Sequence, residues 1–233
     1  MDAGRLVTLQ MILDWNEAPF DESIVDPSAI HSVEDYNLPE RGVHAEYLPT
    51  LLTLKEQIRE YMTYAEEKMG AGAQETDLTL FSTVELHIFQ TYYGGLRLNF
   101  DKTEWIVNDY ELVKQMCEEA NSVKPWLIEQ GSSFDNGQGT LIGSMWQRII
   151  RMLGGTVDGV EYENKWGAYF KVPENTLLKA NEKNQIMTRT TATELMSDGE
   201  RVTGVKALRY DGTEVEITAT KGVIVATGGY GAN

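Results

Sequence analysis

The 233-residue sequence predicts an α/β protein in which helices come first and an antiparallel sheet follows. Apolar residues recur at helical spacing over residues 51–69 and again from position 108. From residue 185 the apolar period changes to two, and Asp-Gly pairs divide the run into three strands. A wholly apolar run at 222–226 then leads into a Thr-Gly-Gly turn at 227–229. We therefore expect helical segments, a three-stranded meander and one further buried strand that ends in a glycine turn.

The composition excludes several classes of function. The net charge is −16, with 36 acidic against 20 basic residues, so the surface repels phosphate backbones and we expect no nucleic-acid partner. The single Cys117 rules out an internal disulfide, and no cysteine or histidine cluster has the spacing of a metal site. The longest apolar runs are too short to cross a bilayer, and the start lacks the pattern of a signal peptide. The cellular compartment is left open.

The N-terminal part of the chain is expected to be partly irregular and partly helical. Four prolines and scattered acids in residues 1–50 interrupt any steady periodicity, which suggests an extended segment pinned by a few aromatic residues. The helix at 51–69 is expected to begin with a capping box of Thr53 and Glu56 and to stop at Gly70.

Four further helices are predicted in the middle of the chain. The first is capped by Asn108, with Glu111 three residues later. Gly154 and Gly155 close the third, and the last has Pro173 in its first turn. The buried stripe of the first of these helices is expected to comprise Leu112, Val113, Met116, Cys117 and Ala120. The approximate ranges of the four are 108–120, 125–131, 144–153 and 172–184.

The strands of the predicted meander lie at about 186–196, 201–209 and 214–220. An Asp-Gly pair separates each strand from the next, and such a pair between alternating runs is a strong hairpin signal. The sheet is therefore the element that the sequence predicts most directly.

The glycine turn after the last strand has a physical use. Glycine without Cβ lets the backbone approach a ligand closely, and Thr227 adds a hydroxyl and a backbone N–H. In open α/β sheets, ligands bind outside the carboxyl ends of the strands. A plain tight turn explains the same four residues, Ala226 to Gly229, equally well.

The meander followed by "GVIVATGGYGAN" resembles the flavin domain of the fumarate reductase and succinate dehydrogenase flavoprotein superfamily, which includes urocanate reductases and ketosteroid dehydrogenases. The resemblance lies in Thr191-Ala192, in "ERVTGV" at 200–205 and in 221–233, with Tyr230 where phenylalanine is common. A second stretch, from "YYGGLRLN" through "VNDYELV" to "WLIEQGSSF", resembles the same family in the same order. We therefore divide the chain into an unmatched segment, 1–81, and the central part of a FAD-binding domain, 82–233.

The resemblance implies a partial Rossmann-like FAD-binding domain with an antiparallel meander and helical excursions. FAD is the implied cofactor. Thr191 and Ala192 lie where such proteins pass the adenine, with Ala192 as the candidate whose backbone reads it. The residues implied for the adenosine–diphosphate side are Ala226, Thr227, Gly228 and Gly229. An ordinary meander strand and an ordinary turn are the alternatives for these two groups.

Other residues carry weaker implications. Gly94 and Gly95 lie where relatives place a loop close to the active site, and Tyr92 and Tyr93, like the nearby Gln90, could face flavin or substrate. Packing in the core or on the surface is the favoured alternative for those three side chains. Arg148 and Arg151 could meet an anionic substrate, but two arginines three apart on a helix more often form a solvated face.

The superfamily opens with a G-x-G-x-x-G turn that receives the FAD diphosphate, and no such turn occurs in this sequence. The family's catalytic arginine and histidines come from a cap after the final glycine turn. We therefore assign no catalytic residue, expect an internal fragment of a longer flavoenzyme, and expect the fragment alone to be inactive.

The implied reaction moves hydride between flavin and the activated C=C bond of a small-molecule substrate, as in fumarate reduction. The electron donor is unknown. A dehydrogenase acting on a ketosteroid or succinate-like substrate is one alternative, and a non-catalytic ligand-binding module is another.

Overall fold

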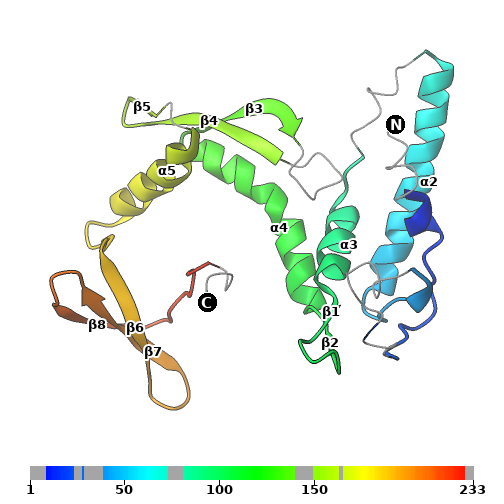
Figure 1. Cartoon of the computed structure of the whole chain (residues 1–233). Coiled ribbons are helices and arrows are strands. Elements are labelled where there is room, and N and C mark those ends of the chain that lie inside the picture. The colour runs from blue at the N-terminus through cyan, green and yellow to red at the C-terminus, as the bar shows by residue number, and fades with distance from the viewer. Residues whose placement is uncertain are drawn as a thin grey trace. The chain divides into compact units, whose positions relative to one another are not determined.

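The computed structural model of the chain describes residues 9–23, 28, 39–72, 81–139, 149–162 and 165–228. The chain divides into two compact units, Met1–Thr176 and Leu177–Asn233. Figure 1 shows their helices and strands in chain order, coloured from blue to red. The mixture of helices and antiparallel strands confirms the α/β prediction.

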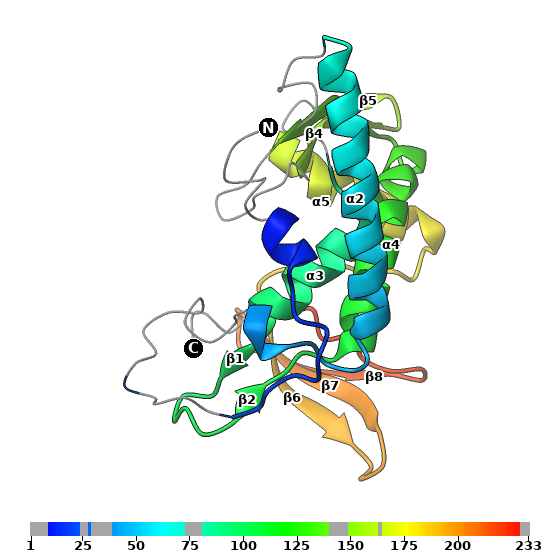
Figure 2. The same ribbon diagram turned by 90° about the vertical axis from the view of Figure 1, so that its right-hand side faces the viewer.

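Three helices dominate the first unit. They are α2 (Leu48–Gly70), α3 (Val84–Gly95) and α4 (Tyr110–Glu129). α3 lies between the other two and contacts both (Figure 1; Figure 2 shows the same helices after a quarter turn). A helical turn at 9–13 and the short 3-10 helix η3 (Pro39–Arg41) precede them. The helix predicted at 51–69 is thus confirmed.

An aromatic core joins the N-terminal segment to these helices. Trp15 donates its indole N–H to the carbonyl oxygen of Gly42 at 2.9 Å, and its ring packs edge-on against Phe89 with centroids 5.1 Å apart. Tyr47 stacks on Tyr92 with centroids 5.4 Å apart and ring planes 3° from parallel. These side chains belong to one buried cluster. The buried residues of the N-terminal segment are therefore part of the helical core.

The start of α2 differs from the predicted capping box. The helix begins at Leu48, and Tyr47 before it offers no side-chain cap. Thr53 lies inside the helix, where its hydroxyl donates to the carbonyl oxygen of Pro49 at 3.1 Å. Pro49 in the first turn explains the earlier start, because the first N–H groups of a helix have no partner within it and a proline loses nothing there.

α4 is one helix where two were predicted. Pro125 lies inside it and removes one backbone hydrogen bond, but the next turn is anchored by the buried Leu127, which clusters with Met152 and Ala168. The cap is Asp109, whose carboxylate accepts the backbone N–H three residues later at 3.1 Å. Asn108, the predicted cap, donates instead to the carbonyl oxygen of Tyr92 at 3.0 Å.

The predicted buried stripe of α4 is only partly buried. Cys117 is 1% exposed and Val113 packs against the core. Leu112 and Met116 are 65% and 52% exposed, and Ala120 is exposed as well. The periodicity identifies the apolar face, but it does not say how much of that face a neighbouring helix covers.

Two small antiparallel sheets complete the first unit. β1 (Arg97–Leu98) pairs with β2 (Trp105–Ile106). The second sheet has the order β3-β4-β5, with strands Ser132–Gly139, Ile149–Val157 and Val160–Tyr162. The helix predicted at 144–153 is wrong over 149–153, which belong to β4, while 144–148 lie outside the described residues.

Gly154 and Gly155 continue β4 instead of ending a helix. They pair with Ser133 and Ser132 on β3. A Cβ on Gly155 would lie 2.7 Å from Cγ2 of Val172, so the glycine lets α5 (Lys165–Ala180) approach the strand. The last predicted helix is therefore α5, which starts earlier than expected and holds its proline in the interior.

The second unit contains the predicted meander. Its strands are β6 (Thr190–Ser197), β7 (Val202–Arg209) and β8 (Glu214–Thr218), paired antiparallel in that order. Gly199 and Gly212 adopt φ values of +97° and +85° in the two turns, which is why glycine follows aspartate there. The three-strand prediction is confirmed.

The strand predicted at 222–226 is not formed. Residues 222–228 have no regular secondary structure, and Ile224 and Val225 are 92% and 65% exposed. A strand needs a hydrogen-bonded neighbour, and none of the described residues pairs with this run. The apolar composition was recognised correctly, but burial requires a partner that the described residues do not supply.

Candidate functional site

The predicted glycine turn is an open stretch of backbone. Ala226, Thr227 and Gly228 are exposed, and no backbone hydrogen bond of 222–228 is formed with any described residue. Gly228 has φ +83°, and no described heavy atom lies within 4 Å of where its Cβ would be. Among the described residues, no backbone group therefore occupies the N–H and C=O groups of this stretch. Gly229 lies outside the described residues.

Thr191 and Ala192 lie on β6, where both are exposed. Thr191 pairs with Leu208 and Ala192 with Ala207, so the two side chains project from opposite faces of the sheet. Only one of them can face a given ligand. No hydrogen bond between described residues joins this pair to Ala226–Gly228, although all lie in the same unit.

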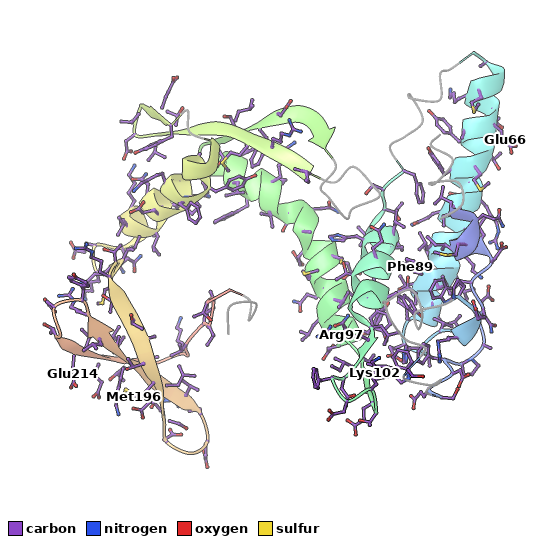
Figure 3. The ribbon with its side chains drawn as sticks, in the orientation of Figure 1. Glu66, Phe89, Arg97, Lys102, Met196 and Glu214 are labelled. Atoms are coloured by element: carbon purple, nitrogen blue, oxygen red, sulfur yellow. The ribbon has the colours of Figure 1, made fainter. Side chains whose placement is uncertain are left out.

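The two faces of the meander differ in chemistry. One carries charges, including an ion pair between Lys206 Nζ and Glu194 Oε2 at 3.0 Å, and that hydrogen bond raises the pKa of Lys206. The other is apolar. Figure 3 labels Met196 on β6 and Glu214 on β8, which are two strands of this sheet. By register, the apolar face comprises Ala192, Leu195, Val205, Ala207, Val215 and Ile217.

Two bulges set this division. Ala192 faces Ala207 and Glu194 faces Lys206, so Thr193 is an extra residue on β6. Further along, an extra residue on β7, Thr203, restores the register. The sequence reasoning missed both. A signal existed, because the apolar residues at 192 and 195 are three apart, and this slip in a period-two pattern indicates a bulge.

Gly95 has a structural role, whereas no described heavy atom lies within 4 Å of where a Cβ on Gly94 would be. A Cβ on Gly95 would collide with the Asn108 side chain, whose amide holds the end of α3. Tyr92 and Tyr93 are 0% and 2% exposed. Tyr92 donates its hydroxyl to Glu46 at 3.1 Å, and burial raises the pKa of both tyrosines. Packing therefore accounts for the two tyrosines, while Gln90 is half-buried on the same helix.

The arginine pair is not a helical pair. Arg151 is an exposed residue of the strand β4, and Arg148 lies outside the described residues. The sheet that holds Arg151 carries a pocket of about 280 Å³, with the carboxylate of Glu161 in its wall. A carboxylate disfavours an anionic ligand, so this pocket does not suit phosphate or an enoate. Its lining is Gly131, Ser133, Leu153, Gly154, Gly155, Thr156, Glu161 and Tyr162.

The described residues contain neither a metal-binding cluster nor a membrane-spanning helix. No group of three or more histidine, cysteine, aspartate or glutamate side chains in those ranges could hold a metal ion. In the same ranges, no helix combines the length and apolarity that crossing a membrane requires.

Comparison with known proteins places the chain in a family. Residues 57–233 match the family described as the FAD binding domain, and the match begins inside α2. Over 189 residues the chain is 34% identical to the NADH:acrylate oxidoreductase of Vibrio harveyi. The aligned region covers 81% of this chain and 17% of that protein. The chain thus spans only a small part of the relative's length. No solved structure matches.

Proposed function

Because the chain belongs to the FAD-binding domain family, we propose that it forms part of the FAD site of an oxidoreductase that acts on an activated C=C bond. The observation that carries the proposal is the 34% identity, over 81% of the chain, to an enzyme named for acrylate. Acrylate is an α,β-unsaturated carboxylate, and so is fumarate. The proposed substrate class is therefore a small enoate.

The described residues fit a dinucleotide. A left-handed glycine with open space around it, at Gly228, lets a bulky ligand approach the backbone. The N–H groups of the same stretch have no backbone partner among the described residues, and they are donors of the kind that a diphosphate or a ribose needs. The apolar face that holds Ala192 suits one side of an adenine ring. We assign the adenosine–diphosphate side of FAD to Ala226, Thr227, Gly228 and Gly229.

We assign the adenine to β6, with Ala192 as the residue whose backbone reads it. Thr191 projects from the charged face, so its side chain is a neighbour and not a second contact to the ring. An N–H donor and a C=O acceptor on adjacent peptide units match the N1 and N6 positions of adenine. With a net charge of −16, the chain has no basic field to hold an anionic cofactor, so local backbone donors or particular arginines would have to do so.

When bound, FAD supplies hydride transfer to or from the carbon–carbon double bond. The residues of this chain bind and orient the cofactor at its adenosine end. We assign them no proton transfer and no contact with the substrate. The direction of the reaction is part of the proposal, with reduction favoured by the relative's name. Dehydrogenation of a ketosteroid or succinate-like substrate is the second candidate within the same chemistry.

The test uses the complete flavoprotein that contains this chain. Purified protein should show the absorbance bands of bound flavin. Anaerobic reduction with dithionite should bleach them, and acrylate or fumarate should restore them within the mixing time of the experiment. Saturated propionate or succinate is the matched control and should leave the flavin reduced. Reoxidation by neither enoate would reject the reductase, and a protein that never holds flavin would favour the binding module.

A further inference from the structure

Thr193, the extra residue of the β6 bulge, lies directly beside the backbone that we assign to adenine. Its hydroxyl donates to the carbonyl oxygen of Lys206 at 3.2 Å. The side chain of the same lysine pairs with Glu194, the other bulge residue, at 3.0 Å. Lys206 therefore holds the bulge at two points, once through its backbone and once through its side chain. The hydroxyl bond reaches the backbone of Lys206, whereas the ion pair joins two exposed side chains, so the hydroxyl is the contact that shapes the bulge.

A bulge changes what the edge of a sheet offers to a ligand. β6 is the outer strand in the order β6-β7-β8, and no other described strand pairs with its free side. An extra residue is left out of the ladder, bends the strand and rotates the adjacent peptide groups. The peptide groups on both sides of Thr193 are thereby turned away from the direction they would have in a regular strand.

We propose that Thr193 is a positioning residue for the adenine of FAD: its hydroxyl fixes the bulge so that the backbone beside Ala192 presents one donor and one acceptor to the base. The inference rests on the proposed function, because it takes Ala192 as the adenine reader. Thr203, the extra residue of the other bulge, lies on the central strand β7, which is paired on both sides. It has no free edge to shape and serves as the internal comparison.

The bulge acts on geometry, so the hydroxyl and not the bulk of Thr193 is the feature that matters. Valine has nearly the same shape and β-branching but no hydroxyl, and serine keeps the hydroxyl while losing the methyl group. Loss of one neutral hydrogen bond that orients a binding group corresponds to a change of about fivefold in affinity. Thr193→Val should therefore weaken FAD by about fivefold, and Thr193→Ser should stay near wild type.

The experiment compares FAD with its hypoxanthine analogue in the apo form of the complete flavoprotein. The analogue differs from FAD only at the base edge that the backbone would read, so the affinity ratio of the two reports on that contact alone. Wild type and Thr203→Val should prefer FAD by about fivefold or more, as expected for one specific hydrogen-bonded edge. Thr193→Val should lose most of this preference and Thr193→Ser should restore it.

Four outcomes contradict the inference or the proposed function on which it rests. An unchanged affinity ratio in Thr193→Val, with or without a lower melting temperature of the apoprotein, overturns the positioning role. Equal loss of the ratio in Thr203→Val assigns the effect to sheet stability and overturns it too. A wild-type protein that binds FAD but does not discriminate against the analogue also rejects this inference, while leaving the proposed FAD site in place. Failure to bind FAD at all rejects the proposed function itself.

Discussion

The helical core of the first unit and the meander of the second are stabilised by different kinds of interaction. Around Phe89, side chains from the N-terminal segment, α2 and α3 are closely packed, and many are fully buried (Figure 3). Among the described residues of the second unit, only Gly204 and Ala207 are buried. The first region is held by packing, whereas the second is held by its backbone ladder and its turns.

Because of this difference, we expect the first region to determine folding stability and the second to determine cofactor binding. Buried aromatic rings contribute free energy wherever they lie, but they offer nothing to a ligand. An exposed sheet with an open edge, followed by a backbone stretch without partners, is poor in packing energy and rich in groups that a cofactor can use. The residues assigned to FAD all lie in the second region, so changes there should affect flavin affinity more than folding. Changes in the first region should do the reverse.

The largest expected effect is the loss of Trp15 from the aromatic core. Trp15 is 4% exposed and combines two ring contacts with its hydrogen bond to Gly42. Trp15→Ala should lower the free energy of unfolding by about 3–5 kcal/mol, as large-to-small core substitutions do. Urea titration followed by circular dichroism measures it. Phe100→Ala is the matched control, because Phe100 is 100% exposed, and it should change stability by less than about 0.5 kcal/mol. Equal losses in both variants would show that the core is not where stability lies.

The next effect concerns Gly228 and should appear in binding. A valine there would strain the left-handed backbone and stand in the space left for the ligand. Gly228→Val should reduce the flavin content of the complete protein by about tenfold, if backbone strain and lost contact together cost one to two kcal/mol. Absorbance of the purified protein gives the flavin-to-protein ratio, and the far-ultraviolet spectrum should show an intact meander.

Gly72→Val provides the control for strain alone. Gly72 has φ +90° and equally open surroundings, but it follows α2 in the first unit. The same substitution there carries a similar backbone penalty far from the assigned site in sequence. Flavin content should stay at the wild-type level. If Gly228→Val also retains normal flavin, the turn is merely structural and the alternative reading of its four residues is right.

The sequence predicted local structure better than it predicted partners. The meander was readable because alternation and Asp-Gly turns are properties of adjacent residues, and Gly199 and Gly212 adopt the positive φ that such turns require. The helix at 144–153 failed because the residues before Gly154 suit a strand or a helix equally, and pairing with β3, such as that of Met152 with Phe134, decides between them. The strand at 222–226 failed for the same reason, since its apolar pattern is real but no described neighbour pairs with it.

The candidate site was predicted from a resemblance and only in part from physics. Glycine chemistry pointed to an open backbone at Gly228, and the structure has one. Strand alternation alone places Thr191 and Ala192 on opposite faces. The sequence did not reveal the bulge at Thr193 or which of the two faces is apolar, because the register depends on what β7 places opposite each residue. The family relationship therefore identified the region, and the strand pairing distinguished the two neighbours within it.

A smaller effect is expected from pH, through His44 in the first unit. His44 stacks on Phe20 with ring centroids 4.3 Å apart, and burial lowers its pKa, although Glu46 and Glu22 act in the opposite direction. A histidine whose folded pKa is lowered stabilises the protein above its unfolded pKa, and that stability is lost as the pH falls below about 6.5. Between pH 7.5 and 5.5 the wild type should lose more stability than His44→Gln, by about 1 kcal/mol or less because the ring is partly solvated. Parallel pH profiles of the two proteins would show that His44 does not contribute to the pH dependence of stability.

The smallest effect is expected from the ion pair of Glu194 and Lys206. It tests whether side-chain contacts contribute to the stability of the exposed meander. Both side chains are exposed, at 61% and 46%, so water and salt screen their attraction. Glu194→Gln should leave the urea midpoint of the chain unchanged within error, both at low salt and in 1 M sodium chloride. The hydroxyl of Thr193 still holds the bulge in this variant, so the preference for FAD over its hypoxanthine analogue should persist. A loss of stability as large as that of Trp15→Ala would mean that an exposed charge pair supports the meander. The contrast between a packed region that folds the chain and an open region that binds the cofactor would then be wrong.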